Sequence, residues 1–262
     1  MKKISVTLLI LFSIVLIGCN GPKREREEQT IDFDPGSSDT HTDSDLPKLF
    51  LSKLNSFSSY KAVTSGQTIT NFLGAKINQT IDVTVIKSDY SYMLNESHSS
   101  MYNTVHTAYF YEQKVAFKNN KGDYQSSSLN DYLSIYGTFP FDAAIEGYSI
   151  SSGCLVNAKK EQVNDNYKIT LEFDKETSTN NVKIQMKKYG GLDDYPKFKE
   201  NTVMEIIVKE DYTPVSLTLK AHYSAKKVIE TDCKQEYTVT YSNFDETIEV
   251  PNLDEVKELF QS

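Results

Sequence analysis

The sequence predicts an α+β protein built on one large, curved antiparallel sheet, an open half-barrel, with a few short helices packed on its concave face. Most of the chain after residue 45 consists of segments in which apolar and polar residues alternate, as in strands with one buried face. Helical spacing occurs in only a few short stretches, which argues against βαβ units and for antiparallel neighbours. A sheet of about ten such strands rolls up instead of staying flat.

The first 18 residues have the three parts of an export signal. Lys2 and Lys3 precede an apolar run from Leu8 to Ile17, and the small residue Gly18 stands before Cys19. As a helix this run rises about 15 Å, half of the roughly 30 Å of a hydrocarbon core, so it is too short to be a stable membrane span. We therefore expect residues 1–18 to be a signal peptide.

The four residues Leu16-Ile17-Gly18-Cys19 resemble the lipobox of bacterial lipoproteins. In that class the Cys thiol is acylated, and the chain is cut before that Cys. The resemblance implies cleavage between Gly18 and Cys19 and a location on the extracytoplasmic face of a cell membrane, with the membrane as partner through the lipid on Cys19. Two or more acyl chains on one residue give stable attachment. The alternative is an ordinary signal peptide in which Cys19 is incidental.

Residues 19–45 have the composition of a disordered acidic tether that begins at the lipidated Cys. Pro22, Pro35 and Gly36 are mixed with many charges, and few large apolar residues occur. A flexible stretch of this length spans roughly 30 Å, enough to hold a domain clear of a surface. The remaining residues, 46–262, are expected to form a single curved-sheet domain.

The first half of this domain predicts two helices and several strands. Asp45 is a candidate N-cap of a helix whose apolar positions are Leu46, Leu49, Phe50, Leu54 and Phe57. Alternation then predicts strands around Thr68–Phe72, Ile81–Val85, Tyr90–Leu94, Tyr109–Tyr111 and Val115–Phe117. The spacing of Leu129, Tyr132, Leu133 and Tyr136 predicts a second helix, with Ser128 or Asn130 as its cap.

The second half repeats the strand pattern. Strands are expected around Ile169–Phe173, Met204–Val208, Val215–Leu219 and Tyr237–Tyr241. Val182, Met186 and Tyr189 predict a third helix that ends at Gly190-Gly191. Leu253, Val256, Leu259 and Phe260 predict a short terminal helix.

This order of elements resembles the fold of bacterial lipoprotein carriers, namely the LolA and LolB localisation factors and the mycobacterial LppX and LprG lipoproteins. The resemblance extends over about Asp45 to Asn243, and it rests on the leading helix, on long alternating strands such as Met204–Lys220 and on Cys19. It implies carriage of an acyl-bearing or otherwise apolar ligand between the helices and the curved sheet.

Several functions are disfavoured by composition and motifs. With 36 acidic and 28 basic residues the formal charge is −8, the wrong sign for a nucleic-acid partner. The four His residues show no metal-ligand spacing. His98 and His106 could meet across a hairpin, but two surface imidazoles on neighbouring strands are the commoner explanation. The paired acids Asp193-Asp194 and Asp245-Glu246 fit solvated loops better than a glycosidase site. We expect no enzyme activity, no cofactor and no metal.

Cys154 and Cys233 are the thiols left once Cys19 is acylated. An even number of cysteines in an exported domain favours a disulfide, here between Cys154 and Cys233. The alternative of two buried free thiols is nearly as well supported.

Two functions compete, and a hydrolase whose catalytic residues the motifs do not reveal is a third, weaker alternative. The first is a non-enzymatic carrier of a lipid or other apolar ligand. Its inward positions include Val83, Val85, Leu171, Phe173, Ile206, Val208, Leu217 and Leu219. The second is a surface-displayed interaction module with a packed core that binds a protein or a glycan. Aromatic groups at Tyr90-Tyr92, Tyr109–Tyr111 and Tyr132-Tyr136 either line a cavity or, more commonly, pack between strands.

Overall fold

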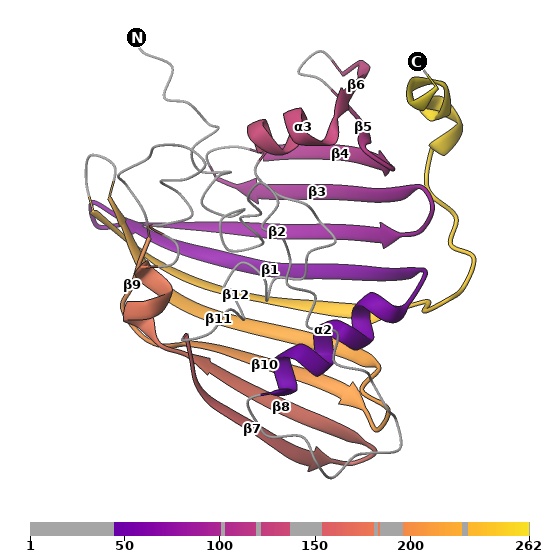
Figure 1. Ribbon diagram of the computed structural model, residues 1–262. Coiled ribbons are helices and arrows are strands. Elements are labelled where there is room, and N and C mark those ends of the chain that lie inside the picture. The colour runs from indigo at the N-terminus through magenta and orange to yellow at the C-terminus, as the bar shows by residue number, and fades with distance from the viewer. Residues whose placement is uncertain are drawn as a thin grey trace.

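The computed structural model describes residues 45–100, 103–118, 122–136, 154–180, 183, 196–226 and 230–261 (Figure 1). Within these residues the structure is dominated by one 12-stranded sheet. Its strands are β1 (Tyr60–Phe72), β2 (Ala75–Lys87), β3 (Ser91–Ser99), β4 (Asn103–Tyr111), β5 (Lys114–Lys118), β6 (Tyr124–Ser128), β7 (Leu155–Val163), β8 (Asn166–Phe173), β9 (Lys197–Phe198), β10 (Thr202–Lys209), β11 (Pro214–Lys226) and β12 (Glu230–Ser242).

The sheet consists of two antiparallel meanders joined side by side. Its order is β6-β5-β4-β3-β2-β1-β12-β11-β10-β8-β7, and the short β9 pairs with β11. The join is the pairing of β1 with β12, which runs from Lys61 opposite Ser242 to Asn71 opposite Asp232. Strands β6 and β7 stand at the two ends of this order, so the described sheet is curved but not closed. The predicted fold class is confirmed.

Two short helices lie on the concave face (Figure 1). Helix α2 (Leu46–Ser56) buries four of the five apolar side chains predicted from its spacing, Leu46, Leu49, Phe50 and Leu54. Phe57 instead lies just beyond the helix, at its C-cap, where the backbone is extended, and is only partly buried. Asp45 stands at its N-cap but makes no side-chain capping bond there, which corrects the prediction; its backbone is already in the helical region. Helix α3 (Leu129–Tyr136) is capped as predicted, because Ser128 Oγ accepts a hydrogen bond from Asp131 N at 3.1 Å.

The C-terminal segment forms two 3₁₀ turns, η2 (Leu253–Glu255) and η3 (Lys257–Phe260), instead of the predicted helix. Val256 separates them because its φ of −121° lies outside the helical range. The third predicted helix, around residues 182–189, lies outside the described residues apart from residue 183. A further helical segment at 175–180 begins where Asp174 Oδ2 accepts a hydrogen bond from Thr177 N at 2.7 Å.

Alternation along the strands separates two apolar clusters on opposite faces. The larger one covers the concave face and includes all of the inward positions predicted from the sequence. The smaller one lies on the convex face, where Tyr92 and Tyr109 pack with Val256 and Phe260 of the C-terminal turns. Tyr109 Oη donates a hydrogen bond to the Pro251 carbonyl at 3.0 Å, so the C-terminal segment is held against this face.

Gly66 of β1 leaves no room for a side chain against β12. It lies opposite Tyr237, and a Cβ atom placed on it would stand 2.6 Å from the Glu236 carbonyl oxygen and overlap Tyr237 Cβ. These are backbone or near-backbone atoms that cannot move aside cheaply. The central pairing of the sheet therefore requires glycine at this position.

We predict that Gly66→Ala destabilises the protein, because the added methyl group must push the two central strands apart. The expected loss is about 1–3 kcal/mol in the free energy of unfolding, the usual cost of overpacking. Urea denaturation measures it, with Ser65→Ala, an exposed neighbour on the same strand, as the control. Equal midpoints for the two variants would contradict the prediction.

Candidate functional site

The concave face of the sheet is the candidate site, because it gathers the apolar side chains of strands from both meanders. Phe173, Leu171, Ile206 and Leu217 have no exposed surface. The other inward positions predicted from the sequence, Val83, Val85, Val208 and Leu219, are buried in the same cluster. Helix α2 packs at one end of this face, where the Phe50 and Tyr241 rings meet edge to face with centroids 6.1 Å apart.

An aromatic group lies under helix α3 at the other end. Tyr132 of α3 contacts Phe110 and Phe117, with ring centroids 5.6 and 5.3 Å apart respectively. His106 of β4 stacks on the Tyr132 ring, and its Nε2 is 2.8 Å from the Tyr132 hydroxyl. Burial lowers the pKa of His106 to about 4, so this imidazole is neutral at pH 7.

The described concave face is uncharged over most of its width. Along β1, β3, β4, β8, β10, β11 and β12, no position that faces the main core is Asp, Glu, Lys or Arg. Charges appear only towards its borders. Lys87, the last residue of β2, donates to the Phe57 carbonyl at 2.7 Å, and Lys160 of β7 donates to the Tyr212 hydroxyl at 3.0 Å.

One line of neutral polar side chains crosses this face. Gln235 of β12 lies opposite Thr68 of β1, which lies opposite Gln79 of β2. On its other side Gln235 lies opposite Ala221 of β11. Val203 of β10 pairs with Lys220 of β11, so the preceding residue, Thr202, lies next to Ala221. We call Thr202, Gln235, Thr68 and Gln79 the polar row. All four are buried, with 0 to 6% of their surface exposed.

Most of the polar row lacks hydrogen-bond partners. Gln79 Nε2 donates to Ser97 Oγ at 2.5 Å. Thr68 Oγ1, Thr202 Oγ1 and both amide atoms of Gln235 are buried with no partner in the described structure. The only other such side-chain atom among the described residues is Ser178 Oγ. Each buried polar group without a hydrogen-bond partner costs about 1–3 kcal/mol of stability. The polar row therefore lowers the stability of the fold, and folding by itself does not explain it.

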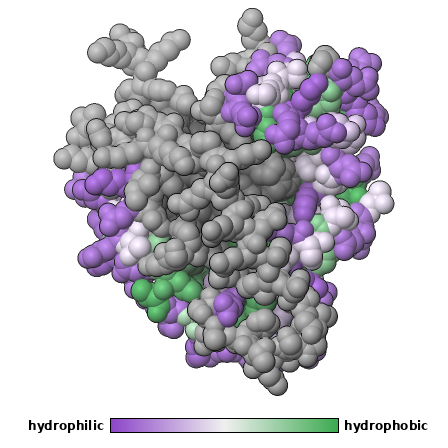
Figure 2. Space-filling model, viewed as in Figure 1, coloured by the Kyte–Doolittle hydropathy of each residue, from purple (hydrophilic) through white to green (hydrophobic). Residues whose placement is uncertain are grey.

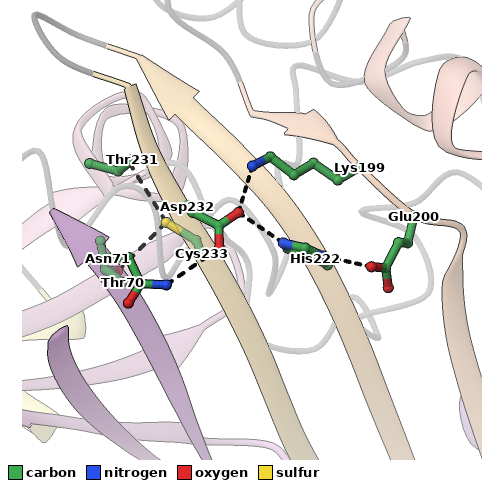
Figure 3. A network of polar contacts seen from close by, with 8 residues as sticks. All are labelled: Thr70, Asn71, Lys199, Glu200, His222, Thr231, Asp232 and Cys233. Atoms are coloured by element: carbon green, nitrogen blue, oxygen red, sulfur yellow. Dashed lines mark hydrogen bonds and ion pairs between the residues drawn. The ribbon is translucent and has the colours of Figure 1, made fainter. Parts of the chain in front are cut away.

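A charged network lies on the opposite, convex face, because Asp232 and His222 alternate with Cys233 and Tyr223 of the main core. Figure 3 shows its contacts. Asp232 Oδ1 accepts from Lys199 Nζ at 2.6 Å and lies 2.8 Å from His222 Nε2, while His222 Nδ1 lies 2.9 Å from Glu200 Oε1. The hydrogen bonds from Lys199 and His222 lower the pKa of Asp232 to about 2. This network ties residues 199–200, which follow β9, to β11 and β12.

The two cysteines within the described residues do not form a disulfide with each other. Cys233 of β12 is buried, and its Sγ lies 3.6 Å from Thr70 Oγ1 on β1. Cys154, also buried, precedes β7, and strands β11, β10 and β8 stand between the two. Four strand spacings amount to about 19 Å along the sheet, whereas a disulfide needs Cα atoms within about 7 Å. The two-thiol alternative fits this geometry, and burial raises the pKa of the Cys233 thiol.

Other residues singled out from the sequence are separated by the strand register. Gly18, Cys19 and the Asp193-Asp194 pair lie outside the described residues. His98 pairs with Asn103 and His106 with Asn95, and the two imidazoles point to opposite faces, so they do not meet. Asp245 Oδ1 accepts from Ser58 N at 2.7 Å, whereas Glu246 Oε2 accepts from Asn243, so this acid pair binds separate partners.

The tyrosine groups are divided between the two faces. Tyr90 stacks on Tyr111 with ring centroids 4.4 Å apart, and Tyr92 packs on Tyr109 at 5.2 Å, all on the convex side. These four rings therefore do not line the concave face, and only Phe110 and Tyr132 of the predicted groups are seen to do so. Cross-strand packing, the commoner role of such groups, describes the convex set.

A groove of about 800 Å³ lies beside the β2–β3 turn and the C-terminal segment. Its lining includes Asp89, Glu249, Asp254 and Glu255, so it is polar and acidic and differs in character from the concave face. Figure 2 shows hydrophilic residues predominating around β5, β6 and the C-terminal turns on the side seen in Figure 1.

None of the helices in the described residues has the length and apolar character needed to cross a membrane. The same part of the chain contains no cluster of three or more His, Cys, Asp or Glu side chains able to hold a metal ion.

No family model matches the chain. No curated protein matches it in sequence. Among solved structures it is similar to LprF from Mycobacterium bovis, with 12% identity, a TM-score of 0.40, and coverage of 80% of this chain and 96% of that one. It is also similar to a LolA superfamily protein from Nitrosomonas europaea, with 9% identity, a TM-score of 0.31, and coverage of 83% and 99%.

A DUF1329 family protein from Desulfovibrio piger shares 9% identity at a TM-score of 0.29, with coverage of 82% of this chain and 96% of that one. The second of these structures bears the LolA name, which is also that of one of the carriers the sequence resembles. At these identities none of the likenesses assigns a ligand to this chain.

The polar row was not found from the sequence. Gln235 is two residues from both Cys233 and Tyr237, which face the core, so it occupies an inward position of its strand. This spacing was the one feature of the sequence that could have revealed it. Alternation marks a polar residue as inward-facing only once the face of its strand is known.

We predict two titratable thiols per mature chain when the protein is denatured without reductant. Cys154 and Cys233 supply both, because they are too far apart to pair and the Cys19 thiol is expected to be consumed by acylation. A thiol-reactive chromophore provides the count. The Cys19→Ala variant is the control and is also expected to show two thiols. Three in the native chain would mean an unmodified Cys19, and none would mean a bridge.

We predict that Asp232→Asn lowers stability in a pH-dependent way. Because the folded-state pKa of Asp232 is about 2, below the usual value of about 3.9, its contribution is complete above pH 4 and is lost as the pH falls towards 2. Urea denaturation of both proteins across this range measures the difference. Glu236→Gln, in an exposed pair with Lys220 on the same face, serves as the control with little expected effect. A difference independent of pH would contradict the assignment.

Proposed function

We propose that this protein is a lipid-anchored lipoprotein of the extracytoplasmic membrane face that binds a lipid or another apolar ligand on the concave face of its sheet, without catalysing a reaction. The observation that carries the proposal is the uncharged, apolar inner surface that extends from β8 across the central strands to β4. Such a surface is suited to a molecule that is mainly hydrocarbon.

The N-terminal sequence supports the cellular part of the proposal. Cleavage before Cys19 and acylation of its thiol attach the chain to a membrane, and residues 19–45 act as the acidic tether. The single domain of residues 46–262 then stands close to a source of apolar ligands. A binding role for the concave face and a lipid anchor are consistent with each other, because both place the protein at a bilayer.

A surface-displayed interaction module with a packed core is the second candidate. The complete burial of Leu171, Met204 and Leu217 favours it, because a filled core buries the same inward positions as an occupied ligand site. The two candidates differ in whether a molecule other than the protein shares that space.

We predict that protein purified from its own membrane retains a stoichiometric apolar molecule. Native mass spectrometry should show a mass above that of the acylated chain, and organic extraction should release the difference. An unrelated lipoprotein purified in the same way controls for carry-over from the membrane. A single species with only the mass of the acylated chain, together with an extract identical to the control, would refute the carrier and support the packed module.

A further inference from the structure

The polar row is the feature of the concave face that an apolar ligand by itself leaves unexplained. Gln235, Thr68 and Thr202 come from three strands, and together they place four buried hydrogen-bonding atoms without partners on one line. Thr202 has no exposed surface, Gln235 has 3% and Thr68 has 6%. A purely hydrocarbon ligand would form no hydrogen bond with any of these four atoms. The free-energy cost of burying them would then have no compensation.

The chemistry of the row indicates what its partner must supply. The Gln235 amide offers one donor group and one acceptor, and each threonine hydroxyl is able to do either. Neighbouring strands lie about 4.8 Å apart, so the three side chains spread over about 15 Å. A partner with several hydroxyl, ester or amide groups near one another fits this spread.

The charge distribution excludes an ionic partner at the same place. No Lys or Arg faces the main core along β10, β11, β12 or β1, and His106 is neutral at pH 7. A phosphate or carboxylate buried there would have no counter-charge, and burying an unpaired charge is far more costly than burying a neutral polar group. The acidic groups nearest to Gln235 in sequence, Asp232 and Glu236, point to the opposite face, because they alternate with Cys233 and Tyr237 of the main core.

We propose that the polar row binds an uncharged polar group, a hydroxyl, ester or amide, of the apolar ligand, and that it selects against ligands with an anionic head. This inference rests on the proposed function, because it assigns the polar part of the molecule whose hydrocarbon part the concave face binds. Gln235 is the central residue of the site.

The test uses the full mature chain after its own ligand has been extracted. Three radiolabelled probes are compared by equilibrium gel filtration: dioctanoylglycerol, dioctanoyl phosphatidic acid with the same chains, and dodecane with no polar group. Wild-type protein is expected to bind dioctanoylglycerol at least tenfold more tightly than phosphatidic acid. Gln235→Leu is expected to weaken dioctanoylglycerol binding about tenfold, the usual effect of losing one or two hydrogen bonds, and to leave dodecane binding unchanged.

The matched control is Gln67→Leu. Gln67 is the neighbour of Thr68 on β1, but its exposed side chain lies on the convex face, so the same substitution there should change neither affinity. If Gln235→Leu does not fold, Thr68→Val combined with Thr202→Val removes the flanking hydroxyls at nearly constant volume, and the same loss of dioctanoylglycerol binding is expected.

A second readout separates a binding role from a structural one. Gln235→Leu should raise the Tm of the ligand-free protein, because it removes two buried polar atoms that have no partners. A lower Tm would show that the amide is satisfied within the folded chain and would overturn the inference. Equal binding of dioctanoylglycerol by wild type and variant, or phosphatidic acid binding as tight as that of dioctanoylglycerol, would overturn it while the proposed function stands. If wild type binds none of the three probes, the proposed function fails, and the inference fails with it.

Discussion

The pairing of β1 with β12 is the constraint on which the rest of this structure depends. It joins residues 61–71 to residues 232–242, nearly the full length of the domain apart, and converts two separate meanders into one continuous sheet. Closing so large a loop costs conformational entropy that local contacts do not recover, so the long central strands must supply many backbone hydrogen bonds and a shared buried face. Gly66 belongs to this join, because only glycine lets the two backbones approach opposite Tyr237.

The same join gives the two faces of the sheet their different character. Side chains of one parity from both meanders come together on the concave face, which is apolar and nearly free of charge. Side chains of the other parity form the ion pairs of the convex face, among them the network of Asp232, Lys199 and His222. Hydrophilic groups in water keep the domain soluble, while the inner face is left for apolar contacts.

The polar row is the one departure from this separation. Natural strands usually place an apolar residue at an inward position, and unmet polar atoms in a core reduce stability. Positions at which a sequence departs from such folding rules, with no compensating contact nearby, are often functional. Three such breaks lie on three strands, β1, β12 and β10, and the register through the intervening β11 aligns them. This alignment points to one common partner more readily than to three unrelated defects.

The sequence by itself determined the local structure of this protein and the residues of its inner face. Period-two alternation predicts the inward set from Val83 to Leu219, helical spacing predicts α2 and α3, and the lipobox residues predict the anchor, because each of these patterns is contained in a short stretch of chain. Only the tertiary structure decided which strands are neighbours. It placed Tyr92 and Tyr109 under the C-terminal turns, turned His98 and His106 to opposite faces, separated Cys154 from Cys233 by three strands, and aligned Gln235 with Thr68 and Thr202. The physical reason is that alternation specifies the two faces of a strand but not its partner or register, and these are set by contacts between residues far apart in the chain.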